Sequence, residues 1–187
     1  MKTYGSIFAL TFALTIATAT QARAQVIFST GPIGIVAWTE VPKDCTIFKG
    51  AGLAATVGNG GITFKTGSYG TITLACYVTA MMRVDPSAVN AFGLTFTNIN
   101  GVVGGVDQCL ISSTVGAYPY AGGFPTAIGA FSTAGQNFTT AETANVALFA
   151  ALNVDANMYT VSIALVRKTG VSCNPVVAAT FLEDVIQ

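Results

Sequence analysis

Alternation of apolar and polar residues is the feature that most constrains the fold of this chain. In the segment TITLACYVTA, residues 71–80, the apolar residues Ile72, Leu74 and Cys76 would share one face, and threonines occupy the other. A period of two is typical of a strand with one buried face, because successive side chains of a strand point to opposite sides of the sheet. The segment therefore predicts a half-buried strand with Cys76 directed toward the core.

Similar short runs recur along the chain between clusters of Gly, Pro, Asn and Asp. We expect strands at 26–29, 34–41, 46–49, 62–65, 71–80, 92–98, 109–113, 146–152, 159–167 and 176–182. The segment 139–152 could instead form a helix, because its alanines and Glu142 favour one. Tight turns are expected at 59–61 and 100–101, where Asn and Gly accept a positive φ. Many short strands at this spacing predict an all-β fold, an antiparallel β-sandwich or jelly roll.

The N-terminal segment has the pattern of a secretory signal peptide. Lys2 is followed by an apolar run at 7–19 and then by Ala22-Arg23-Ala24, whose small residues suit a signal peptidase. We expect residues 1–24 to be removed before Gln25, and residues 25–187 to form a single β-sandwich domain. The apolar run is about half the length of a membrane-spanning helix. The pattern predicts a secreted protein, extracellular or periplasmic, with no transmembrane segment after cleavage.

The four cysteines predict two disulfides that cross-link the sandwich. An even number of cysteines in an exported chain is typical of a disulfide framework. Three pairings are open, and we favour Cys45 with Cys76 and Cys109 with Cys173, because neighbouring cysteines are easier to close into a loop. The cysteines are isolated from one another and the chain contains no histidine, so we expect no metal site and no cofactor.

Charged residues are scarce. They make up 9% of the sequence, whereas an average globular chain has about a quarter. Such a surface attracts neither nucleic acid nor an anionic membrane. Because few charges hydrate or repel it, we expect a homo-oligomer. We expect its contacts at two strands with few lysines, 71–80 and 176–182, if these lie at sheet edges.

Most catalytic arrangements are excluded by residue type. The absence of histidine rules out Ser-His and Cys-His nucleophiles. A glycosidase needs only two carboxylates, and the acidic residues are Glu40, Asp44, Asp85, Asp107, Glu142, Asp155, Glu183 and Asp184. The segment 153–157 has alternating oxygen ligands like the start of a calcium loop, but lacks the later Gly and Glu of such a loop. We leave enzymatic activity open and favour a protein that is not an enzyme.

An uncharged aromatic stretch, GAYPYAGGFPTAIGAF at 116–131, is the candidate ligand-binding segment. Tyr118, Tyr120 and Phe124, held by two prolines, could present flat apolar faces to a sugar or a protein. Trp38 could join them or belong to the core. We favour the interpretation that these rings fold back as a lid over one end of the sandwich, because a chain this apolar has much surface to cover.

Two classes of function follow from these features. The first is an exported structural or adhesive subunit that acts by self-association or by binding a cell surface. The second is a carbohydrate-binding module or small glycosidase that uses the aromatic segment. A shallow groove that contains Trp38, or Tyr118 and Tyr120 with a polar residue between them, would favour carbohydrate binding. A flat apolar face or an unpaired edge strand would favour assembly.

Overall fold

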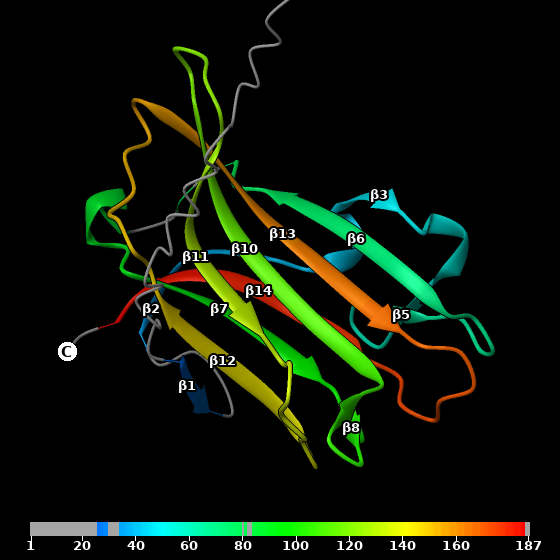
Figure 1. Ribbon diagram of the computed structural model, residues 1–187. Coiled ribbons are helices and arrows are strands. Elements are labelled where there is room, and N and C mark those ends of the chain that lie inside the picture. The colour runs from blue at the N-terminus through cyan, green and yellow to red at the C-terminus, as the bar shows by residue number, and fades with distance from the viewer. Residues whose placement is uncertain (1–25, 30–33, 80, 82–83, 186–187) are drawn as a thin grey trace, which may run out of the picture.

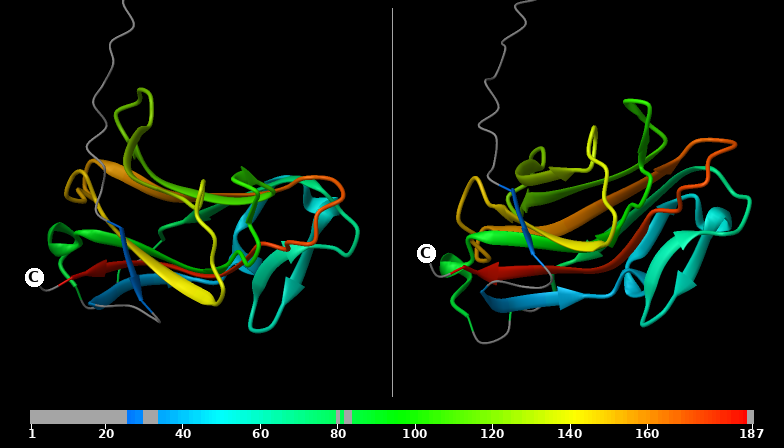
Figure 2. Two further views of the ribbon diagram at one scale, coloured as in Figure 1. Left: turned by 60° about the horizontal axis from the view of Figure 1, so that its bottom comes forward. Right: turned by 90° about the horizontal axis from the view of Figure 1, so that it is seen from below.

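The protein is an antiparallel β-sandwich. The computed structural model describes residues 26–29, 34–79, 81 and 84–185, and the expected signal peptide lies outside these residues. Two β-sheets stack as two layers, with β13 in one layer and β14 in the other (Figures 1 and 2). All strand pairs within the two sheets are antiparallel, so the predicted fold class is confirmed.

Sheet A is the larger layer. Its path runs β1 (Val26–Ser29), β12 (Ala141–Ala147), β7 (Ala91–Thr97), β14 (Val176–Asp184), β5 (Gly61–Phe64) and β4 (Ala54–Val57), and β2 (Ile35–Glu40) also pairs with β14. Glycine is required within this sheet at Gly93, because the ring of Phe181 lies where a Cβ atom would stand. Among the described residues, β1, β2 and β4 each pair with a single strand, so all three are edges of sheet A.

Sheet B has five strands, and its long central strands position the candidate site. The order is β11 (Thr126–Ser132), β10 (Cys109–Pro119), β13 (Asn157–Arg167), β6 (Gly70–Tyr77) and β3 (Thr46–Lys49). The smaller elements are the β8 (Val102–Val103) and β9 (Val106–Asp107) hairpin and the 3-10 turns η1 (Pro42–Asp44), η2 (Ala51–Leu53) and η3 (Pro86–Ala88). The edges of sheet B are β11 and β3.

The hydrophobic core fills the space between the sheets. Alternate residues of β10, including Ile111 and Val115, are buried, as are Ile163 and Leu165 of the neighbouring β13. Phenylalanines of sheet A, such as Phe96, belong to the same cluster. The period-two pattern of the sequence thus corresponds to one inward and one outward face for each of these strands.

Three expectations about the strands need correction. The strands at 71–80 and 176–182 are not edges, since β6 lies between β13 and β3, and β14 lies between β7 and the β2 and β5 strands. The helix considered at 139–152 does not form. Its residues 141–147 form β12, because pairing with β1 and β7 outweighs the helix preference of the alanines. The strand expected at 146–152 therefore begins and ends earlier.

Both disulfides form with the favoured pairing. Cys45, just before β3, bonds to Cys76 on the adjacent β6. Cys109, the first residue of β10, bonds to Cys173 in the connection between β13 and β14. The second bridge therefore ties the start of a central strand of sheet B to the chain that leads back into sheet A. Among the described residues, no helix is long and apolar enough to cross a membrane.

The long strand β10 separates two ends of the sandwich that differ in composition. We call the end at Cys109 the disulfide end; it also contains the β8–β9 hairpin. We call the end at Pro119 the aromatic end; it contains the hairpin tip at 120–125, the connection at 148–156 and the described residues of the segment 78–90 (Figure 1). Ten residue steps along β10 place the two ends roughly 33 Å apart.

Candidate ligand-binding site

The aromatic segment 116–131 forms a hairpin rather than a lid. Its residues belong to β10 and β11, which pair up to Ala117 and Thr126, and 120–125 form the tip between them. Because this pairing extends the chain away from the core, the rings are not folded onto it. Tyr120 is 66% exposed and Phe124 is 93% exposed. The lid interpretation is therefore wrong.

The structure places Trp38 in the core instead of with these aromatics. Trp38 lies on β2, pairs with Leu182 of β14 and is only 4% exposed. Its side chain offers no surface to a ligand, because packing between the sheets covers it. We therefore remove Trp38 from the candidate ligand-binding residues.

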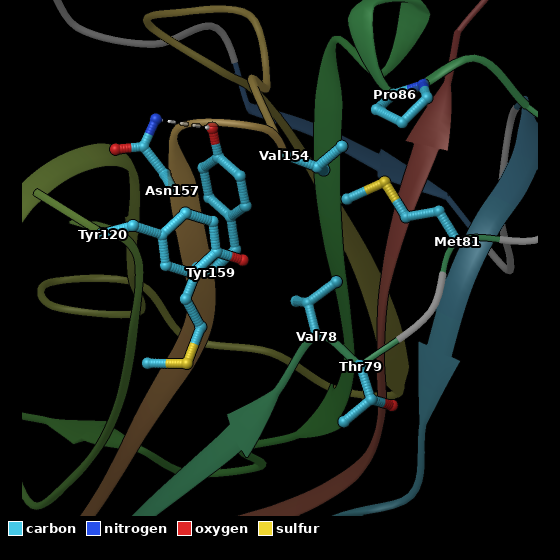
Figure 3. A pocket seen from close by; sticks show the side chains of 9 residues that line it. Val78, Thr79, Met81, Pro86, Tyr120, Val154, Asn157 and Tyr159 are labelled. Atoms are coloured by element: carbon cyan, nitrogen blue, oxygen red, sulfur yellow. Dashed lines mark hydrogen bonds between the residues drawn. The ribbon is translucent and has the colours of Figure 1, made fainter.

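A pocket of about 330 Å³ lies at the aromatic end. Its lining residues are Val78, Thr79, Met81, Pro86, Tyr120, Val154, Asn157, Met158 and Tyr159. Tyr120, Asn157 and Tyr159 lie on one side, facing Val78, Thr79 and Met81 on the other (Figure 3). Three connections that are distant in the sequence thus supply one concave site, a common arrangement for small-ligand pockets.

Hydrogen bonds fix the buried tyrosine of this pocket. The hydroxyl of Tyr159 accepts a hydrogen bond from the backbone N–H of Asn153 at 2.6 Å and one from Nδ2 of Asn157 at 3.4 Å (Figure 3). Its backbone carbonyl accepts one from Val78 N–H at 3.0 Å. Tyr159 therefore links the wall formed by β13 to the facing segment, and its ring is held in one position.

Tyr120 is anchored through its backbone, and its side chain is free to contact solvent. Its N–H donates to the carbonyl of Ala156 at 2.9 Å, which joins the hairpin tip to the connection before β13. The turn after it is closed by Gly122 N–H, which donates to Pro119 O at 3.1 Å. A tyrosine ring with a fixed backbone loses little conformational entropy when it binds a ligand.

The lining of the pocket contains no acidic or basic residue, so the pocket is uncharged. The nearest titratable group with a shifted pKa is Asp85, which precedes the lining residue Pro86. Its pKa is lowered by hydrogen bonds to its carboxylate, first from the backbone N–H of Ser87 and then from the Ser87 hydroxyl. Asp85 thus caps η3 and is fully exposed, so it shapes the rim of the pocket by holding a turn.

The remaining predicted residues, Tyr118 and Phe124, lie outside the lining of the pocket. Tyr118 is on the outer face of sheet B, opposite Met158 in the β10–β13 register, and is 37% exposed. Phe124 is at the hairpin tip. Of the four predicted ligand-binding residues, only Tyr120 lines the pocket.

Sequence reasoning missed Tyr159 and Asn157. Asn157 closes the segment considered as a calcium loop, and its Nδ2 donates instead to the carbonyl of Asn153 at 3.2 Å. The Oδ1 of Asn153 accepts from the N–H of Ala156 at 3.2 Å. These side chains stabilise the turn before β13. A tyrosine at the start of an apolar strand was the available signal, since such a residue can have one end buried and the other at the rim.

Comparisons with known proteins do not assign a family. No protein-family model and no curated protein matches the sequence. Among solved structures, a family two carbohydrate esterase from Cellvibrio japonicus has a TM-score of 0.44 and 14% identity; the match covers 86% of this chain and 34% of the esterase, so this chain spans about a third of that protein. A family 11 carbohydrate-binding module from Clostridium thermocellum, in complex with a beta-1,3-1,4-mixed-linked tetrasaccharide, has a TM-score of 0.40 and 10% identity over 91% of this chain and 94% of the module. Scores and identities at this level define neither a family nor a function for this chain.

Proposed function

We propose that this protein binds an uncharged carbohydrate, without cleaving it, in the pocket at the aromatic end. The observation that carries the proposal is the composition of the pocket: Tyr120 and Tyr159 stand on one wall with the amide of Asn157, and no lining side chain is charged. Of the residues expected in such a groove, Tyr120 is in the lining, while Trp38 and Tyr118 are not; Tyr159 is the second tyrosine of the pocket.

The chemistry of a sugar ring fits these residues. A neutral pyranose has apolar C–H faces and a polar edge of hydroxyl groups, so it needs a flat apolar contact and a few groups that both donate and accept hydrogen bonds. Tyr120 provides the exposed ring and a hydroxyl that can both donate and accept. The Oδ1 of Asn157 provides an acceptor, while its Nδ2 donates to Asn153 and Tyr159 within the protein. Because carboxylates and amines are absent from the lining, a charged sugar would lose hydration without gaining an ionic partner.

Binding without hydrolysis is favoured by the same lining. Glycosidases use two carboxylates that flank the scissile bond, separated by about 5–9.5 Å. None of the eight acidic residues of the sequence lines this pocket. A carbohydrate-binding role is therefore better supported for this site than a small glycosidase.

We place this activity outside the cytoplasm, in an extracellular or periplasmic location. The N-terminal pattern of a signal peptide motivates this placement, and the two disulfides support it, because such bonds persist in oxidising compartments.

A glycan array followed by calorimetry tests the proposal. The mature protein should bind at least one neutral glycan, and Tyr120→Ala should weaken that binding about tenfold, equivalent to about 1.4 kcal/mol. Tyr69→Ala is the matched control, because Tyr69 is also an exposed tyrosine but precedes β6 at the disulfide end. No glycan retained on the array, or equal losses for the two variants, would contradict carbohydrate binding in this pocket.

Self-association, as in an adhesive or structural subunit, is a second candidate with its own observation. The edge strand β4 contains no charged residue and no proline, which are the usual protections of a free edge. Thr56 on this strand is exposed. If β4 pairs with another copy, light scattering at micromolar concentration should give more than one chain mass for the wild type. Thr56→Lys should restore the monomer, and a wild-type monomer would exclude this candidate.

A further inference from the structure

We infer that the binding surface continues from the pocket over the outer face of sheet B, where it takes further units of the same neutral glycan chain. This inference rests on the proposed function and specifies its ligand as an oligosaccharide or polysaccharide. The strip involved follows β10 and β13, from Tyr118 and Met158 at the aromatic end toward the middle of the sheet.

The strip is continuous with the pocket through Met158. This residue lines the pocket and is also the Cα partner of Tyr118 on β10. Both side chains are exposed, whereas their strand neighbours Tyr159 and Ala117 are buried. Met158 and Tyr118 therefore lie together on the outer face, where a chain leaving the pocket would meet them first.

Gly116 determines how the Tyr118 ring lies on this strip. A Cβ atom on Gly116 would stand 3.0 Å from Cε2 of the Tyr118 ring, closer than ordinary packing allows. Gly116 and Tyr118 are two residues apart, so they share the outer face of β10. Because Gly116 has no side chain, the Tyr118 ring lies back along the strand instead of standing away from it. This geometry provides an aromatic surface beside the pocket.

The outward residues of the two strands are complementary to a neutral ligand. On β10 and β13 they are Leu110, Ser112, Thr114, Gly116, Tyr118, Met158, Thr160, Ser162, Ala164 and Val166. None is charged, and five of them carry a hydroxyl group. From Tyr118 to Thr114 the strip measures roughly 13 Å, so it extends well beyond the pocket.

One buried hydroxyl on this strip has no hydrogen-bond partner among the described residues. Thr160 is only 3% exposed, and its Oγ1 atom is unpaired. Its Cα partners are Gly116 on one side and Tyr77 on the other, so it lies beside the Tyr118 ring. A buried hydroxyl without a partner is unfavourable. A ligand hydroxyl that reaches Thr160 from the outer face would supply the missing hydrogen bond.

The test compares short and long ligands by calorimetry. The probes are a disaccharide and a hexasaccharide of β-linked glucose, whose equatorial hydroxyls leave both ring faces flat. We expect the wild type to bind the hexasaccharide about tenfold more tightly. Tyr118→Ala should remove this advantage and leave the disaccharide affinity unchanged, and Gly116→Val should do the same because it displaces the ring. Tyr120→Ala should weaken the binding of both ligands, and Tyr69→Ala should weaken the binding of neither.

Thr160→Val provides an independent readout. The substitution keeps the shape of the side chain and removes the unpaired hydroxyl, so the melting temperature should stay the same or rise. The hexasaccharide affinity should fall about threefold. If the wild-type protein binds the disaccharide and the hexasaccharide with equal affinity, the extension is overturned. The same holds if Tyr118→Ala weakens the binding of both ligands equally. The pocket proposal stands in either case. Failure of the wild type to bind either probe would overturn the proposed function for β-linked glucans and the extension with it.

Discussion

The two ends of the sandwich contain pockets of nearly equal size but different chemistry. The pocket at the aromatic end measures about 330 Å³ and the one at the disulfide end about 320 Å³. The second is lined by Asn100, Val103, Gln108, Gly170, Val171, Ser172 and Cys173. Neither lining contains a charged residue, but only the first contains aromatic rings. Neither volume nor neutrality therefore distinguishes the candidate site. The exposed ring of Tyr120 distinguishes it, with the buried Tyr159 ring behind it in the wall of the pocket.

The two ends are also held together differently. At the disulfide end, a covalent bond joins Cys109 to Cys173. At the aromatic end, hydrogen bonds from Asn153 and Asn157 to Tyr159, and from Tyr120 to Ala156, connect the segments. We therefore expect loss of the bridge at the disulfide end to act on the stability of the protein, and changes at the aromatic end to act on binding and on local stability.

The largest expected effect comes from replacing both Cys109 and Cys173 with alanine. The bridge closes a sequence separation of 64 residues, and the chain-entropy model gives a loss of about 4 kcal/mol in the free energy of unfolding. Urea denaturation measures this loss. Glycan affinity should be retained where the variant is folded, because the pocket lies at the opposite end. Lost affinity in a folded variant would show that the two ends are coupled.

A smaller effect, on binding alone, should separate ring shape from hydrophobicity at Tyr120. Tyr120→Trp keeps a flat ring and should hold the glycan affinity within about threefold of the wild type. Tyr120→Leu keeps apolar surface without a ring and should lose about tenfold, or about 1.4 kcal/mol. Calorimetry with the glycan identified on the array gives both values. If the Tyr120→Trp and Tyr120→Leu variants bind the glycan with the same affinity, the pocket needs only an apolar side chain at this position and not a flat ring.

Tyr159→Phe should have a smaller effect, on the stability of the aromatic end. The variant keeps the ring but leaves the Asn153 N–H and the Asn157 amide without the hydroxyl that they contact. We expect a loss of about 1 kcal/mol in the free energy of unfolding, because the net contribution of such bonds is modest. Amide exchange should rise at Asn153 and stay unchanged around the Cys109–Cys173 bridge. Unchanged exchange at Asn153 would mean that this hydrogen bond does not hold the end together.

The smallest effect concerns pH. The lowered pKa of Asp85 means that its contribution to stability is present above its ordinary pKa and is lost as the pH falls through the lowered, folded-state value. Ser87→Ala should raise this pKa only in part, because the stronger cause, the Ser87 backbone N–H, remains. A carboxyl NMR titration of the two proteins measures the change. Glycan affinity should stay constant between about pH 5 and pH 8, because neither a carboxylate nor an amine lines the pocket.

Local patterns were sufficient for much of the fold. The alternation in 71–80 predicted β6 and the inward position of Cys76, and the Asn-Gly steps predicted turns where Gly60 and Asn100 have positive φ. These features depend on side-chain direction and backbone sterics within a few residues. The helix considered at 139–152 failed because strand pairing with β1 and β7, which lie far away in the sequence, decides the structure of β12.

The fold class and the presence of two disulfides follow from the sequence alone, because alternation and cysteine number are properties of the chain. Only the tertiary structure decided which residues meet. Pairing of β10 with β13 brings Tyr118 opposite Met158, and the contact of Tyr120 with Ala156 completes a pocket that includes Tyr159. The same packing buries Trp38. Such outcomes depend on the register between distant strands, which no local pattern specifies.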